Sequence, residues 1–231
     1  MLRVKKNSTA RKYYEKYKHY LLFVAYLMFY LVGFSALESA SHRHYHVIHS
    51  VIDDMIPFNE YFVIPYYLWF FYIGAGVCWF IFKESQRDYD KLVSALCIGM
   101  TVFLIVSCIF PNRLELRPTS FAHHNFCTWL VQKLYKTDTP TNVLPSIHVF
   151  NTLIMLYAIR RSTILQKHRW VELGTAVLSV LIILSTMFLR QHSVVDVSCG
   201  ILMSIAVQMF VDKLFDTREN SLAQRLGQVN E

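Results

Sequence analysis

The chain has 231 residues, of which 54% are hydrophobic and only 17% are charged. Soluble domains carry about a quarter charged residues, so the composition argues against an ordinary soluble protein. The formal net charge of +7 would suit a nucleic-acid-binding protein, but the basic residues cluster beside long apolar runs, as is typical of membrane anchoring. We therefore predict a membrane protein that binds no nucleic acid.

Six apolar runs follow one another along the chain. Most approach the ~20 residues that cross a bilayer core, and the bilayer favours helices because backbone polar groups cannot stay unpaired in lipid. The fourth run is short, so it needs residues 145–147 at one end and snorkelling of Arg160 and Arg161 at the other to span. The runs are Tyr20–Leu37, Tyr61–Phe82, Leu92–Phe110, His148–Ile159, Val171–Leu189 and Val194–Phe215.

This pattern predicts an all-α fold, a polytopic membrane bundle of six transmembrane helices within residues 20–215. A basic cytoplasmic arm, 1–19, would precede the bundle, and a cytoplasmic tail, 216–231, would follow it. The arm, the second and fourth connections and the tail hold 17 Lys and Arg residues, whereas the other side holds 6. Because cytoplasmic segments carry the excess of Lys and Arg, we expect both termini in the cytoplasm, and we expect the protein in the plasma membrane.

Two long loops fall on the non-cytoplasmic side. The second, Pro111–Leu144, carries four apolar residues at helical spacing, namely Phe126, Trp129, Leu130 and Leu134. This stripe predicts a short interfacial helix between the third and fourth spans, with Trp129 at headgroup depth.

The first non-cytoplasmic loop, Glu38–Glu60, is rich in histidine. Imidazoles at His42, His44, His46 and His49 are compatible with a metal site, but no cysteine or carboxylate completes a clear ligand set within the same few residues. A solvated or interfacial loop is the simpler interpretation. We predict no metal and no cofactor.

Three polar stretches lie on the side with few positive charges: residues 112–118, Pro145–His148 and Arg190–Asp196. Proline suits the first turn of a helix, whose free N–H groups bind anions, and Ser146 and His148 add a hydroxyl and a proton-transfer group. His192 and Asp196 are four residues apart and share one face if the last helix has begun there. The carboxylate would then orient the imidazole.

Each stretch alone has an ordinary explanation, namely a helix N-terminus, a polar helix end or an interfacial anchor. Arg117 and Arg190 are suited to a tetrahedral anion because a guanidinium matches phosphate oxygens. The charge count places these groups on one membrane face, where ionisable residues indicate function.

The three stretches resemble the signature motifs of the type 2 phosphatidic acid phosphatase family: a lysine with Arg-Pro, then Pro-Ser-x-His, then Ser-Arg-x5-His-x3-Asp. Arg117-Pro118, Pro145–His148 and His192 with Asp196 carry the resemblance. The Pro-Ser-Ile-His and Arg-Gln-His-x3-Asp forms are most similar to the branch that includes inositol phosphorylceramide synthases.

The resemblance implies a catalytic role for three of these residues. His192 would be the nucleophile that forms a phosphohistidine, Asp196 would orient it, and His148 would protonate the leaving oxygen. Arg117 and Ser146 would hold the phosphate.

Two family positions differ in this chain. The family's lysine falls on Phe110, for which Arg113 is a nearby substitute, and its arginine falls on Thr186, with Arg190 one helical turn later. These two arginines complete the expected phosphate-binding set.

We therefore expect a lipid phosphatase that hydrolyses a phosphomonoester of a phosphatidic acid-like lipid at the non-cytoplasmic face. A lipid phosphotransferase that moves a phosphorylated head group is the first alternative, and a non-catalytic membrane protein or transporter is the second. The expected partners are the lipid phosphate and the bilayer; the sequence leaves the oligomeric state open.

Overall fold

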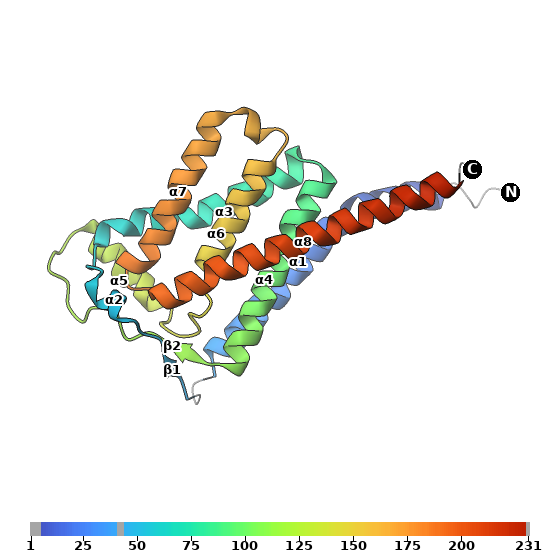
Figure 1. Ribbon diagram of the computed structural model, residues 1–231. Helices are drawn as coiled ribbons and strands as arrows, with labels where there is room; N and C mark the ends of the chain where they lie inside the picture. The colour runs from blue at the N-terminus through green and yellow to red at the C-terminus, as the bar shows by residue number, and fades with distance from the viewer. Residues whose placement is uncertain (1–5, 41–43, 230–231) are drawn as a thin grey trace.

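The computed structural model describes residues 6–40 and 44–229. Its long helices pack side by side (Figure 1), which confirms the all-α prediction. The long helices are α1 (Lys6–Glu38), α3 (Val63–Lys83), α4 (Gln86–Ile109), α6 (Ile147–Arg161), α7 (Arg169–Phe188) and α8 (Val194–Val229). The shorter elements are α2 (Val51–Met55), α5 (Phe126–Thr137), the 3-10 helices Glu60–Phe62 and Leu165–Lys167, and the parallel strands β1 (His46–Val47) and β2 (Asn112–Arg113).

Five of the described helices are long and apolar enough to cross a membrane: α1, α3, α4, α7 and α8. Helix α6 has 15 residues, about 22 Å at 1.5 Å per residue, and the hydrocarbon core is roughly 30 Å thick. The sixth span therefore stays a prediction.

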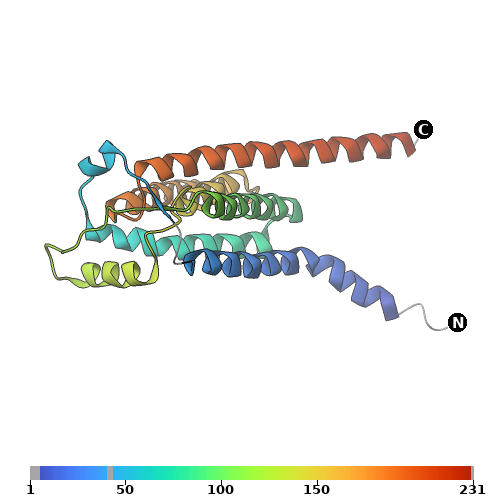
Figure 2. The same ribbon diagram turned by 90° about the horizontal axis from the view of Figure 1, so that it is seen from below.

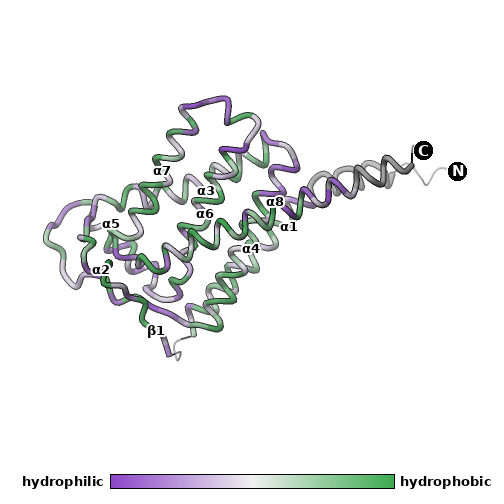
Figure 3. The backbone as a smooth tube through the Cα atoms, in the orientation of Figure 1, coloured by the Kyte–Doolittle hydropathy of each residue, from purple (hydrophilic) through white to green (hydrophobic). Residues whose placement is uncertain are grey.

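Large apolar side chains cover the outer surface of the bundle. Phe29, Phe71, Trp170 and Met209 are 62%, 73%, 85% and 68% exposed, and they lie on α1, α3, α7 and α8. Figure 3 shows hydrophobic residues along the helices and hydrophilic residues at several of the connections. A water-soluble protein does not expose apolar surface on this scale, so the fold is that of a multi-pass membrane protein.

Helix α6 lies at the centre of the bundle and packs against α3, α4, α7 and α8. Its residues Val149, Phe150, Ile154 and Met155 are at most 1% exposed. A Cβ atom on Gly99 of α4 would lie 2.0 Å from the Phe150 ring, so glycine is needed there for the close approach of the two helices. Because α6 is surrounded by protein, it needs little lipid-facing apolar surface of its own.

Two helices extend beyond the bundle at the same end (Figures 1 and 2): the N-terminal part of α1 and the C-terminal part of α8. Residues 6–19 and 216–229 continue these helices. At the opposite end α1, α4 and α7 finish and α3, α6 and α8 begin. Four residues used in the charge and histidine arguments, Arg3, Lys5, His42 and Arg43, lie outside the described residues.

Candidate active site

The starts of α6 and α8 are in direct contact, which brings two of the three polar stretches together. The backbone N–H of Ser146 donates to the carbonyl oxygen of Asp196 at 3.0 Å. A Cβ atom on Gly200 would lie 2.7 Å from the Ser146 carbonyl oxygen. The absence of a side chain at Gly200 therefore allows α8 to approach this closely.

His148, His192 and Asp196 form a continuous hydrogen-bonded row. Nδ1 of His148 lies 3.2 Å from Nε2 of His192, and Nδ1 of His192 lies 2.5 Å from Oδ2 of Asp196. His192 is 6% exposed and Asp196 is fully buried. The Asp196 carboxylate fixes the proton of His192 on Nδ1, which leaves Nε2 as a lone pair facing His148.

Helix α8 begins at Val194, so His192 precedes the helix. His192 and Asp196 therefore do not share a helix face, as they would if the helix had begun at His192. The pair still meets, because the turn before α8 is held by other residues. The His192 backbone N–H donates to the Thr186 carbonyl at 3.0 Å. Asp53, only 2% exposed, accepts from the Val194 backbone N–H at 2.8 Å and from the Ser193 hydroxyl at 2.6 Å.

Asp53 lies outside the three polar stretches that the sequence indicates as a site. Ser50 and Asp53 form a capping box for α2, and that Ser-x-x-Asp signal is visible in the sequence. It does not reveal that the same carboxylate also caps α8, 140 positions further along the chain. This second contact exists only in the folded protein.

Two further polar residues extend the histidine row. The Tyr66 hydroxyl oxygen lies within hydrogen-bonding distance of two groups, 3.1 Å from Nε2 of His148 and 3.1 Å from Oδ2 of Asp138. Burial raises the pKa of Asp138, an effect that His192, Tyr66 and Arg117 partly offset. Neither residue belongs to the polar stretches from which the site was predicted. Tyr66 is 1% exposed, so its side chain lies inside the bundle.

Arg117 joins the same neighbourhood through its guanidinium group. It donates to the Gln191 side-chain oxygen, to the Asp138 carbonyl at 2.8 Å and to the Tyr135 carbonyl at 3.2 Å. The guanidinium also lies 4.5 Å from the centre of the Tyr135 ring. These oxygens are neutral, so no carboxylate side chain is hydrogen-bonded to this half-buried cation within the described residues. The Asp138 carboxyl attracts the guanidinium electrostatically without a hydrogen bond to it.

Two buried donors beside His192 have no hydrogen-bond partner among the described residues: Nε of Arg117 and Nε2 of Gln191. Buried donors are almost always satisfied in folded proteins. An oxyanion bound next to His192 would supply acceptors for both.

Asn112 holds the loop that leads into α6. Its side-chain oxygen accepts from the backbone N–H groups of Val143 and Leu144 at 2.8 and 2.9 Å. Its own strand β2 pairs with β1. The two long loops are thereby tied together directly before Pro145, although the sequence analysis gave Asn112 no individual role.

The remaining predicted phosphate ligands make other contacts in the structure. The Arg190 backbone has a positive φ of 54°, and its guanidinium donates to the carbonyls of Asp53 and Ile56 at 2.7 and 2.5 Å. It therefore secures the end of α2, not a helix face beside His192. Arg113 is exposed on β2 and pairs with Glu115. The Ser146 hydroxyl is fully buried and accepts from the Val149 backbone N–H at 3.4 Å, as the N-cap of α6.

The histidines of the first loop have other contacts. The His46 ring stacks on Phe110 with centroids 4.4 Å apart, and Nε2 of His49 lies 3.0 Å from Oδ1 of Asp54. Within the described parts of the chain, no three His, Cys, Asp or Glu side chains gather as a candidate metal site.

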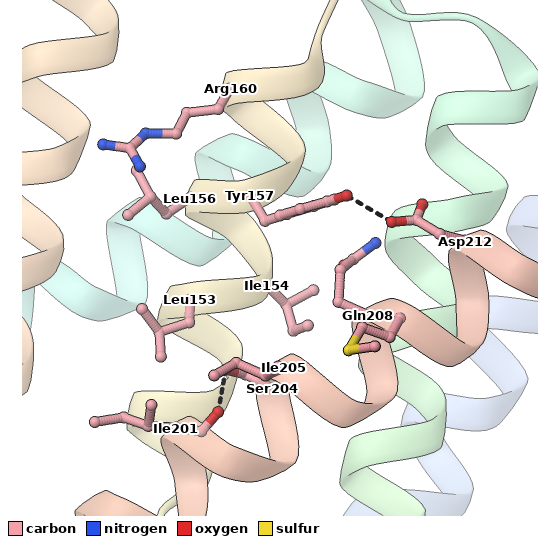
Figure 4. A pocket seen from close by; sticks show the side chains of 11 residues that line it. Leu153, Ile154, Leu156, Tyr157, Arg160, Ile201, Ser204, Ile205, Gln208 and Asp212 are labelled. Carbon is pink, nitrogen blue, oxygen red and sulfur yellow. Dashed lines mark hydrogen bonds between the residues drawn. The ribbon is translucent and has the colours of Figure 1, made fainter.

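A groove lies between α6, which carries His148, and α8, which begins two residues after His192 (Figure 4). Its volume is about 370 Å³, and Leu153, Leu156, Ile201 and Ile205 form part of its apolar lining. At its other end the Tyr157 hydroxyl donates to Oδ2 of Asp212 at 2.5 Å. The groove begins five residues beyond His148 on α6 and five beyond Asp196 on α8, about 7.5 Å along each helix axis.

The chain matches no protein-family model, no curated protein and no solved structure. The proposed function therefore rests on the geometry of the His148–His192–Asp196 row and on the sequence motifs.

Proposed function

We propose that this protein is a membrane lipid phosphatase that hydrolyses a phosphomonoester through a phosphohistidine intermediate. The observation that carries the proposal is the His148–His192–Asp196 row, with nitrogen atoms 3.2 Å apart and a carboxylate behind the nucleophile. A nucleophile, its orienting carboxylate and a second proton-transfer group within hydrogen-bonding distance are the parts that covalent phosphoryl transfer requires.

In the first step, Nε2 of His192 attacks phosphorus and the P–O bond to the lipid breaks. His148 donates a proton to the leaving oxygen, which departs as an alcohol. In the second step, water attacks the phosphohistidine, and His148 takes its proton. Phosphate leaves and the lone pair of His192 is restored. Asp196 stabilises the positive charge that develops on His192 in both steps.

Arg117 supplies the positive charge that phosphoryl transfer needs near the equatorial oxygens. Its guanidinium has no directly bonded counter-ion among the described residues, and the unsatisfied donors of Arg117 and Gln191 lie at the same place. A phosphate bound there would accept hydrogen bonds from these donors and balance the charge of Arg117.

The lipid character of the substrate rests on the α6–α8 groove. It has the volume of a small-molecule pocket, its lining is mostly apolar, and it runs along the two helices whose starts hold the histidines. A phosphate beside His192 and an acyl chain in this groove are compatible with one lipid molecule.

The proposal includes the finer membrane arrangement. Helix α6 would be a sixth, short span, and α5 would lie at the interface, since Phe126 and Trp129 are 70% and 51% exposed while Val131 and Leu134 pack inward. Both termini would be cytoplasmic in the plasma membrane, because α1 and α8 extend from the end opposite to the histidines. The catalytic row would then open on the non-cytoplasmic face.

The test is product analysis with a phosphatidic acid labelled in its phosphate, using wild type and His192→Ala. We expect free labelled phosphate from the wild type and none from the variant. A labelled lipid formed with a second lipid alcohol would instead identify the phosphotransferase. Turnover by His192→Ala, or no turnover of any phospholipid by the wild type, would contradict the catalytic proposal.

A further inference from the structure

The row of polar side chains at the site is longer than the catalytic proposal requires. Four hydrogen bonds join five groups in the order Asp138, Tyr66, His148, His192 and Asp196. The groups come from α3, α6, α8 and the two loops before α6 and α8. Tyr66 and Asp138 have no place in the two chemical steps above.

The number of protons in this row follows from counting its bonds. Each of the four hydrogen bonds needs one proton. Two ionised carboxylates, a neutral phenol and two neutral imidazoles supply only three. The intact row therefore contains a fourth proton and has a net charge of −1, wherever that proton resides.

The direction of the bonds indicates where the fourth proton lies before the reaction. Nucleophilic His192 must keep its proton on Nδ1, toward Asp196, so that Nε2 is free. A neutral His148 then has its proton on Nδ1, toward His192, and its Nε2 accepts from the Tyr66 hydroxyl. Since Tyr66 has one proton to give, its oxygen must accept from Asp138. This arrangement places the fourth proton on the Asp138 carboxyl.

Burial of Asp138 favours this state. Burial and the nearby Glu38 raise the pKa of the Asp138 carboxyl, whereas His192, Tyr66 and Arg117 offset part of the rise. Arg117 donates to the backbone carbonyl of Asp138 and not to its carboxyl group. The carboxyl group is therefore left for the hydrogen bond with Tyr66. A neutral carboxylic acid beside Tyr66 satisfies every bond in the row.

We propose that Tyr66 and Asp138 form a proton reserve that acts through His148; this rests on the proposed function. When His148 gives its Nδ1 proton to the leaving oxygen, Tyr66 gives its own proton to Nε2 of His148. Asp138 in turn gives a proton to Tyr66. The P–O bond breaks, the alcohol gains one proton, and Asp138 becomes a carboxylate. His148 passes from one neutral tautomer to the other, so it never becomes an anion.

The reverse transfer completes the cycle. Water that attacks the phosphohistidine loses a proton to Nδ1 of His148, Nε2 of His148 returns a proton to Tyr66, and Tyr66 returns one to Asp138. The row then holds four protons again. No proton needs to come from bulk solvent between the two steps.

The test separates proton supply from phosphorus attack by the choice of leaving group. A lipid alkoxide needs a proton to depart, whereas 4-nitrophenolate does not. We expect Tyr66→Phe and Asp138→Asn to lower kcat about 100-fold or more with a short-chain phosphatidic acid. With 4-nitrophenyl phosphate the same variants should release the first equivalent of 4-nitrophenolate, measured as a pre-steady-state burst, within about 3-fold of the wild-type rate, since general acid catalysis contributes little to that step.

Tyr67→Phe is the matched control, because Tyr67 is the exposed neighbour on α3 and should behave as wild type with both substrates. Equal losses with the two substrates would show that Tyr66 and Asp138 only support the fold, and would overturn the proton reserve while the phosphatase proposal stands. An active His192→Ala would instead overturn the phosphatase proposal.

A second measurement does not depend on turnover. The wild type in detergent should show an infrared carbonyl band of a protonated carboxyl group at neutral pH, and Asp138→Asn should remove it. If the band is missing from the wild type, or persists in Asp138→Asn and disappears in Asp196→Asn, the fourth proton does not lie on Asp138 and the proposal fails.

Discussion

Nδ1 of His148 lies 3.2 Å from Nε2 of His192, although 44 positions separate the two residues in the chain. The contact forms because Gly200 lets the start of α8 approach the start of α6. In the resting site the hydrogen bond between the two imidazoles contains a single proton. A substrate phosphate that enters between them would break this bond and leave one ring as a nucleophile and the other as an acid.

Replacement of the two histidines should therefore have different consequences. His192→Ala is expected to abolish turnover of every phosphate ester, because no other group can form the intermediate. His148→Ala should lower kcat with lipid phosphates by about 100- to 10,000-fold but retain the initial burst of 4-nitrophenolate from 4-nitrophenyl phosphate. Steady-state kinetics with the lipid and pre-steady-state kinetics with 4-nitrophenyl phosphate measure the difference. His124→Ala, an exposed histidine, is the control, and equal effects of the two active-site variants would contradict the division of roles.

Asp196→Asn should lower kcat by at least about 100-fold with little change in KM. The amide keeps the size of the carboxylate but cannot stabilise the positive charge that develops on His192. Trapping of labelled phosphoenzyme should show a slower formation of the intermediate. Formation at the wild-type rate would remove Asp196 from the orienting role.

Arg117→Lys should raise KM about 10-fold or more, since an ammonium group cannot replace the guanidinium contacts to phosphate. Arg113→Ala tests whether the exposed arginine binds phosphate; its ion pair with Glu115 on the surface predicts a change of less than about 2-fold. Initial rates over a range of lipid concentrations distinguish the two. A larger effect at Arg113 would reverse the assignment.

Asp53→Ala should destabilise the protein by about 1–3 kcal/mol, because the buried backbone N–H of Val194 and the hydroxyl of Ser193 would lose their acceptor. Asp54→Ala is the matched control, since the Asp54 side chain is 63% exposed. Thermal unfolding in detergent, followed by circular dichroism, gives both values. Equal melting temperatures for the two variants would show that the α8 cap contributes little.

The pH dependence of the lipid phosphatase rate should reflect the fourth proton of the row. Because the pKa of Asp138 is raised by burial, that proton is present at low pH and is lost as the pH rises through the elevated pKa. The kcat with phosphatidic acid should fall in that range, while kcat with 4-nitrophenyl phosphate should not. A parallel fall with both substrates would assign the titration to another group.

The all-α class and the membrane-spanning helices α1, α3, α4, α7 and α8 were predictable from the sequence. Apolar runs near 20 residues leave helix as the local solution in a bilayer, and capping signals such as Ser50 and Asp53 mark helix starts. The motif residues His148, His192 and Asp196 were also identifiable, since their types and spacings are local features of the chain. These inferences depend only on neighbours in sequence.

The contacts that build the site depended on the tertiary structure. Tyr66 is one of many aromatic residues in its run, and nothing in the sequence distinguishes it from Tyr67, yet only packing places its hydroxyl between His148 and Asp138. Arg190 was expected on a helix face, but the left-handed turn directs its guanidinium to α2. Such long-range partners follow from how helices approach one another, and residues such as Gly99 and Gly200 control that approach through atoms they lack.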